Sequence, residues 1–149
     1  MRFYVHGEPA TQGSMTAVYN RRLRCSAVRH SNAPALGIWR TDIAHAAREA
    51  GGTVVDGPVA ITIVFGMRAP QNTKHGYPKK GDLDKLVRAV LDALTGVLYV
   101  NDNQVVSISA VKVWQPYTEI EVLAVARRQA SNQATLWQED AYRVETHTP

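Results

Sequence analysis

At 149 residues the chain has the length of one domain with a single hydrophobic core. Its lone cysteine, Cys25, excludes an intramolecular disulfide, and no apolar run reaches the roughly 18 residues that span a membrane, so a soluble, cytoplasmic protein without a membrane partner is expected. Seventeen Lys and Arg against thirteen Asp and Glu give a net charge of +4, which is compatible with a polyanionic partner but does not require one.

The first half of the chain is predicted to contain two strands and one helix. Residues 2–6 read as a short strand, and residues 11–34, rich in Gly, Ser, Asn and Arg, as a loop or irregular hairpin. Apolar residues recur at helical spacing over about 36–50, and the Gly pair at 51–52 ends that helix. Residues 58–67 alternate between two largely apolar faces, so a strand buried on both faces is expected.

The second half is predicted to continue with a loop, a helix and a hairpin. A Pro- and Gly-containing loop over 69–81 leads to a helix over about 84–95, whose apolar stripe packs on a sheet. Strands over 105–113 and 119–126 meet at Gln115-Pro116. We therefore expect an α+β fold in which two main helices pack on a mixed sheet.

The domain is expected to cover residues 1–126. The remaining residues, 127–149, form a polar tail that is expected to be partly helical or disordered.

Three aspartates lie at the ends of the second predicted helix. Asp82 and Asp84 form an Asp-x-Asp pair at its start, and Asp102 follows its end. In extended backbone Asp82 and Asp84 share one face, and Asp102 joins them if the chain folds back after the helix. Such carboxylates suit magnesium or manganese. Taken singly, Asp84 is better explained as an N-cap. Asp102, in Asn101-Asp-Asn-Gln, is by itself better explained as a turn residue.

Basic residues gather in two segments, for which solvated loops are the alternative explanation. The first runs from Arg21 to Arg29. The second surrounds the Asp-x-Asp pair, as expected where a phosphate backbone is led onto a metal site. It supplies the predicted DNA-binding residues Lys74, Lys79, Lys80, Lys85 and Arg88.

One face of the second helix is charged. Asp84, Arg88 and Asp92 follow at four-residue spacing, opposite the apolar stripe, so Arg88 lies one turn from Asp84 and points the same way. The simpler interpretation of Arg88 and Asp92 is an exposed ion pair.

The segment from Gly81 to Val106 closely resembles the signature of the RusA-type Holliday junction resolvases. In that signature an Asp-x-Asp opens a helix, an Asp-Ala-Leu lies near its end, and an Asp-x-Gln-Val begins the next strand. Weaker agreement extends to the first strand, to residues 7–14 and to Trp39-Arg40. The matching segments here are Asp82-Leu-Asp84, Asp92-Ala-Leu94 and Asp102-Asn-Gln-Val105.

The resemblance implies a homodimeric, magnesium-dependent endodeoxyribonuclease that nicks four-way DNA junctions in recombination and repair. It implies catalytic, metal-binding carboxylates at Asp82, Asp84 and Asp102, with manganese as a substitute metal. The family has a lysine at the position of Arg88 and an asparagine at that of Lys85. Arg88 keeps the charge but fixes its protonation, which favours charge stabilisation over proton transfer. Asp92 is expected to be structural.

These residues predict a hydrolytic mechanism. Metal ions held by carboxylates activate a water, neutralise charge in the transition state and support the departing oxygen, while Arg88 stabilises the scissile phosphate. Two alternatives use the same residues differently. One is a non-catalytic, structure-specific DNA-binding protein with the same basic surface. The other is a metal-dependent glycosyltransferase or phosphatase, because Asp-x-Asp is a weak motif by itself.

Overall fold

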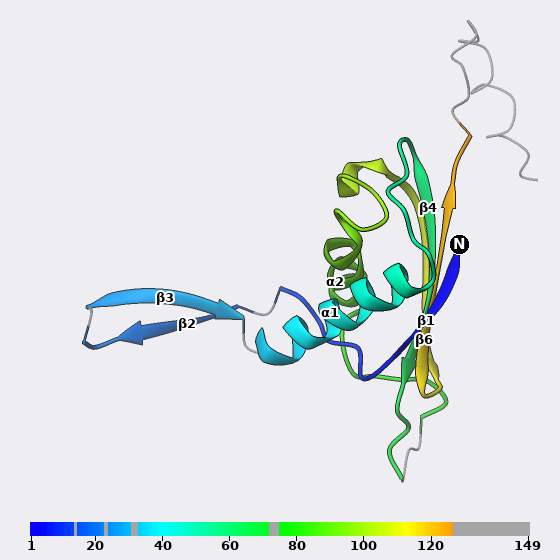
Figure 1. The fold of residues 1–149 in the computed structure, drawn as a ribbon. Helices are drawn as coiled ribbons and strands as arrows, with labels where there is room; N and C mark the ends of the chain where they lie inside the picture. The colour runs from blue at the N-terminus through cyan, green and yellow to red at the C-terminus, as the bar shows by residue number, and fades with distance from the viewer. Residues whose placement is uncertain (14, 23, 31–32, 72–74, 127–149) are drawn as a thin grey trace, which may run out of the picture.

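A four-stranded mixed sheet, in the order β1-β6-β4-β5, carries two helices on one of its faces in the computed structural model (Figure 1). The structure describes residues 1–126 except 14, 23, 31–32 and 72–74, so the predicted tail over 127–149 lies outside the described residues. The expected α+β class is confirmed. In chain order the elements are β1 (Arg2–His6), β2 (Met15–Asn20), β3 (Cys25–His30), α1 (Ala33–Glu49), β4 (Val59–Met67), α2 (Leu83–Leu94), the 3₁₀ turn η1 (Asp102–Gln104), β5 (Val105–Trp114) and β6 (Tyr117–Ala124).

Both helices follow from their apolar stripes. α1 buries Leu36, Trp39, Ile43 and Ala47 against the sheet and ends at Glu49. Gly51, two residues later, adopts the positive φ of 79° that is favoured after a helix C-terminus. α1 starts three residues earlier than predicted, since Pro34 is tolerated in a first turn. α2 begins one residue earlier than predicted and ends one earlier.

The sheet is buried on one face only. Ile61, Ile63 and Phe65 of β4 are buried under the helices, whereas Thr62 on the opposite face is exposed. The prediction that both faces are buried is therefore wrong. β4 runs parallel to β5 but antiparallel to β6, and both helices lie on the same side, which leaves the other side to solvent (Figure 1).

α2 lies in the connection between β4 and β5, which are neighbouring parallel strands. β4 leads into the loop before α2, and after α2 the chain returns through η1 into β5, as a parallel pair requires. α2 and β5 consequently run in opposite directions along the sheet. The predicted turn at Gln115-Pro116 then joins β5 to β6.

Within the segment predicted as a loop or irregular hairpin, the described residues form two paired strands. β2 pairs antiparallel with β3 in a separate two-stranded sheet, from Met15 opposite His30 to Asn20 opposite Cys25. This ribbon projects away from the main sheet beyond the start of α1 (Figure 1). Among the described helices, none combines the length and the apolar character needed to span a bilayer.

Candidate active site

Asp82 and Asp84 lie at the N-terminus of α2. Asp82 is the N-cap residue, with φ −72° and ψ 133°, and Asp84 is in the first helical turn. The extended backbone expected for the pair therefore holds only for Asp82, and the cap is Asp82 rather than Asp84. The Asp82 carboxylate makes no capping hydrogen bond but forms an ion pair with Lys85 Nζ at 2.6 Å. Both aspartates are exposed.

Lys85 determines the electrostatics of Asp82. Its hydrogen bond and its charge lower the pKa of the Asp82 carboxyl, with a smaller contribution from the charge of Lys112, and Asp82 in turn raises the pKa of Lys85. The positive end of the α2 dipole favours anions at the same place. The Asp82 carboxyl is therefore ionised at neutral pH and already partnered by an ammonium group.

Lys112 of β5 was not identified from the sequence as a residue of this site. Its Nζ donates to the carbonyl of Gly81 at 2.7 Å, directly before Asp82, and to that of Lys80 at 3.4 Å. The only available signal was a single lysine in the otherwise uncharged strand β5. Lys112 anchors the loop that positions the Asp-x-Asp pair.

The segment after β1 forms a second wall of the site. Gln12 N donates to the carbonyl of Lys85 at 3.0 Å, and Glu8 forms an ion pair with Lys80. A Cβ on Gly13 would lie 4.0 Å from both the Arg88 guanidinium and the Lys85 side chain. The described part of this segment, residues 7–13, which carried part of the family resemblance, thus packs against the start of α2.

Asp102 lies at the opposite end of α2. It opens η1, where Asn101 and Gln104 form a capping box: Asn101 accepts from Asn103 N at 3.0 Å, and Gln104 Oε1 accepts from Asn101 N at 3.1 Å. Gln104 Nε2 donates to the carbonyls of Val55 and Gly57 at 3.0 and 2.8 Å. These bonds fix the turn that carries Asp102.

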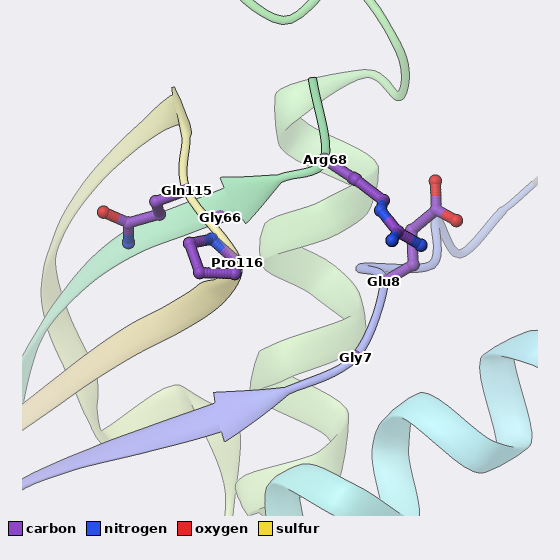
Figure 2. Close-up of a pocket in the computed structure, with 6 residues that line it drawn as sticks. All are labelled: Gly7, Glu8, Gly66, Arg68, Gln115 and Pro116. Atoms are coloured by element: carbon purple, nitrogen blue, oxygen red, sulfur yellow. The ribbon is translucent and has the colours of Figure 1, made fainter. Parts of the chain in front are cut away.

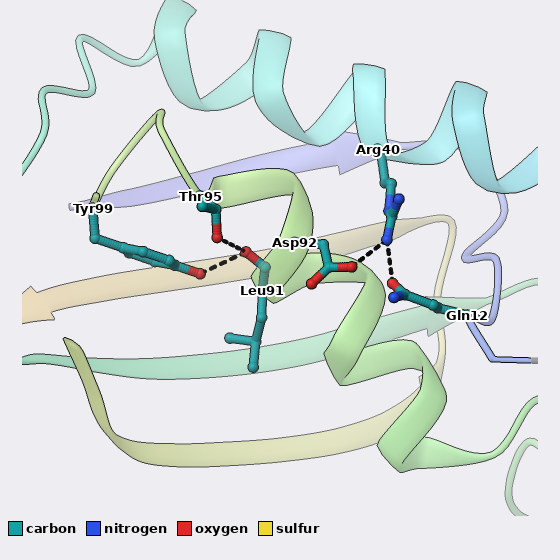
Figure 3. A network of polar contacts seen from close by, with 6 residues as sticks. All are labelled: Gln12, Arg40, Leu91, Asp92, Thr95 and Tyr99. Carbon is teal, nitrogen blue, oxygen red and sulfur yellow. Dashed lines mark hydrogen bonds and ion pairs between the residues drawn. The ribbon is translucent and has the colours of Figure 1, made fainter. Parts of the chain in front are cut away.

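Within the chain the three aspartates do not converge. Asp102 acts electrostatically on Tyr99, whose hydroxyl donates to the carbonyl of Leu91 near the C-terminus of α2 (Figure 3). Twelve helical residues at 1.5 Å each separate that end from Asp82 by roughly 18 Å. In the described part of the chain no group of three or more acidic, His or Cys side chains is arranged to hold a metal. The expected folding back of Asp102 onto the pair is therefore not seen in a single chain.

The predicted DNA-binding cations gather at the Asp82 end of α2. Lys79 and Arg88 are exposed, Lys80 pairs with Glu8, and Lys85 pairs with Asp82. Lys74 lies outside the described residues. Three more arginines, Arg21, Arg22 and Arg24, are exposed at the turn between β2 and β3.

The simpler interpretation of Arg88 is not supported. Asp92 forms its ion pair with Arg40 of α1, and Arg88 has no ion pair within the described residues (Figure 3). Arg88 thus remains exposed one turn after Asp84, on the side of the Gly13 backbone.

Comparison with known proteins identifies the family. No curated protein matches the chain significantly. The family described as endodeoxyribonuclease RusA matches residues 14–123, which include the three aspartates, Arg88 and both helices. The match covers well over half of the chain, and the chain therefore belongs to the RusA endodeoxyribonuclease family.

Proposed function

We propose that the protein is a metal-dependent endodeoxyribonuclease that resolves four-way DNA junctions as a symmetric homodimer. The observation that carries this proposal is the exposed Asp82–Asp84 pair at the N-terminus of α2, surrounded by Lys79, Lys80 and Arg88, in a chain of the RusA family. Family membership is incompatible with the glycosyltransferase alternative.

The donor set fits a hard divalent cation such as magnesium, with manganese as a substitute. Asp82 and Asp84 are exposed carboxylates two residues apart, and such ions bind one or two carboxylates together with substrate phosphates. A cation held there supplies charge neutralisation and water activation. Lys85, which pairs with Asp82, has to share or release that carboxylate when the cation binds.

The cations around the pair receive the DNA backbone. Lys79 and Lys80 precede the acidic pair on the loop, and Arg88 follows Asp84 by one helical turn. We assign Arg88 to the scissile phosphate, because its guanidinium is always charged and presents several donors to phosphate oxygens. The lysines hold neighbouring phosphates and orient the strand.

A second copy of the chain supplies the third carboxylate. β5 is an edge strand of the sheet, and Val106, Ile108 and Val111 on it are exposed. Edge strands with exposed apolar residues are suited to pairing with another strand. Antiparallel pairing of two β5 strands about a twofold axis places the start of one beside the end of the other.

This arrangement completes the site. Asp102 precedes the start of β5, and Lys112, near its end, binds the carbonyl of Gly81 next to Asp82. Asp102 of the partner subunit is therefore brought toward Asp82 and Asp84. A twofold dimer then carries two composite sites, as the two symmetric nicks in a four-way junction require.

Subunit complementation tests the proposal. Asp84→Asn and Asp102→Asn each abolish cleavage as homodimers while four-way junction binding persists, because each change removes one ligand and one phosphate-repelling charge. After subunit exchange, a mixed dimer of the two variants has one doubly defective site and one intact site. We expect this mixture to recover nicking of a single strand in magnesium.

The opposite results are equally clear. A mixture that stays inactive, although mixed dimers form, would show that each subunit uses only its own aspartates. If the wild-type protein binds four-way junctions but does not cleave them with any divalent metal, the non-catalytic DNA-binding alternative is favoured. Isolated mixed dimers of wild type with Asp84→Asn serve as the control, and they should also nick one strand.

A further inference from the structure

A cavity of about 170 Å³ lies beside the acidic pair, at the end of β4 and β5. Its lining combines three aromatic side chains with three cations: His75, Tyr77, Trp114, Arg68, Lys79 and Lys80. Arg68 and Glu8 also line an adjacent cavity of about 310 Å³, where both side chains project into the same space (Figure 2). The aromatic cavity shares its loop with Asp82, two residues after Lys80.

Side chains of β5 anchor this loop at two points. Trp114 Nε1 donates to the carbonyl of His75 at 3.4 Å, and Lys112 Nζ donates to that of Gly81. The two side chains stand two residues apart and therefore share one face of β5. The aromatic cavity and the acidic pair are consequently held in a common frame rather than on separate elements.

Part of the aromatic surface of this cavity is accessible to a ligand. Tyr77 is 61% exposed, and its ring lies 6.3 Å from that of His75 with an interplanar angle of 43°. Trp114 is half-buried and packs against the hydrophobic core, so the inner wall is rigid while the outer wall, Tyr77, is accessible. Both aromatic side chains line the same cavity, so a planar ring that enters it meets aromatic carbon.

The charge of the lining selects the ligand. The carboxylate of Glu8 already pairs with Lys80, which leaves Arg68 and Lys79 to attract a negative group. A planar aromatic group joined to phosphates is a nucleotide, and base stacking on aromatic side chains beside cations is how proteins hold single-stranded DNA. Bases inside a duplex are not accessible to such a cavity, whereas unstacked bases at a branch point are.

We propose that the cavity lined by His75, Tyr77 and Trp114 binds one unstacked nucleobase of the DNA strand, adjacent to the phosphate that is cleaved. This inference rests on the proposed function. It assigns Tyr77 a positioning role: the captured base fixes which phosphate lies at Asp82 and Asp84, and it favours branched over fully paired DNA.

Photocrosslinking of junctions that carry 5-iodouracil tests the proposal in EDTA, where cleavage does not occur. We place the modified base at each nucleotide around the branch point and map the crosslinked peptide by mass spectrometry. We expect a crosslink to His75, Tyr77 or Trp114 from one position near the branch. We also expect Tyr77→Ala to weaken junction binding about fivefold or more.

The matched control is Tyr4→Ala. Tyr4 is 50% exposed on the uncovered face of the sheet, so the same truncation there should leave binding unchanged. Stable junction binding without a crosslink in the cavity, or equal affinities for Tyr77→Ala and Tyr4→Ala, would overturn the proposal. Crosslinking at the cavity in a protein that fails to cleave with any metal would instead sink the proposed nuclease function and leave the base site standing.

Discussion

Arg40 of α1 forms an ion pair with Asp92 of α2 and donates a second hydrogen bond to the Gln12 side chain (Figure 3). The guanidinium therefore joins three segments: both helices and the loop after β1. That loop in turn bonds the first turn of α2 through Gln12 N. Arg40 and Asp92 thus hold the backbone behind the acidic pair, and these contacts support the structural role expected for Asp92.

We predict that Asp92→Ala lowers the free energy of unfolding by about 1 kcal/mol, the upper range for a partly exposed pair. The reason is that the Arg40 guanidinium loses its carboxylate while its Nε is already buried without a partner among the described residues. Urea denaturation measures the change. Arg48→Ala, on the exposed last turn of α1, is the control and should differ little from wild type. An unchanged unfolding midpoint for Asp92→Ala would contradict this role.

We predict that Gln104→Ala and Gln104→Glu both destabilise the turn that carries Asp102, by about 1–3 kcal/mol. Glutamate fails because its carboxylate cannot donate to the carbonyls of Val55 and Gly57. Single-turnover kinetics should show slower cleavage, with junction binding retained. Asn103→Ala, one residue earlier and exposed, is the comparison. Wild-type melting temperature and rate in both Gln104 variants would refute the prediction.

We predict that Asp82 titrates at lower pH in wild type than in Lys85→Met, in the absence of metal. The Lys85 ammonium lowers the pKa of Asp82, so the carboxylate stays ionised to more acidic pH. The ion pair therefore contributes stability above the unfolded-state pKa of the carboxyl, and this contribution is lost as pH falls through the lower folded-state pKa. Carbon-13 NMR titration of the Asp82 carboxyl reads the shift directly, with Lys79→Met as the control. Identical titration curves in wild type and Lys85→Met would argue against the pair in solution.

We predict that Arg88→Ala slows single-turnover cleavage at least tenfold while junction affinity changes by less than about threefold. A contact made mainly in the transition state affects the rate, whereas many cations share the binding. Stability should stay within about 0.5 kcal/mol, because Arg88 is exposed and has no ion pair in the described ranges. Arg88→Lys should recover part of the rate. Equal losses of affinity and rate would place Arg88 among the binding cations instead.

Much of the fold could be predicted from local patterns. The apolar stripes of α1 and α2, the strand at Val59–Met67 and the hairpin at Gln115-Pro116 all depend on residues close in sequence. The exposed side of β4 could not be predicted, because the sequence pattern at Thr62 and Val64 is compatible both with a face covered by a helix and with a face open to solvent. That difference depends on where the two helices pack, which is a tertiary property.

The site was only partly predictable for a similar reason. Asp82, Asp84 and Arg88 lie within two helical turns, so their proximity follows from spacing. The position of Asp102 depends on α2 and β5 running in opposite directions, which separates it from the pair within one chain. Lys112 reaches the site from a distant strand through a backbone carbonyl, and no motif marks it. Glu8 reaches it through an ion pair with Lys80, which the weak resemblance over residues 7–14 did not indicate.

The edge position of β1 has a consequence for synthesis on the ribosome. In the sheet order β1 has β6 as its one neighbour, and the Met1 ammonium bonds the carbonyl of Val122, 121 positions away. All residues between β1 and β6 are translated while β1 has no strand to pair with. Closing so long a loop is slow, and it follows the more local β4–α2–β5 unit. β1 is therefore translated long before β6, and its backbone stays unpaired in the nascent chain until β6 is made.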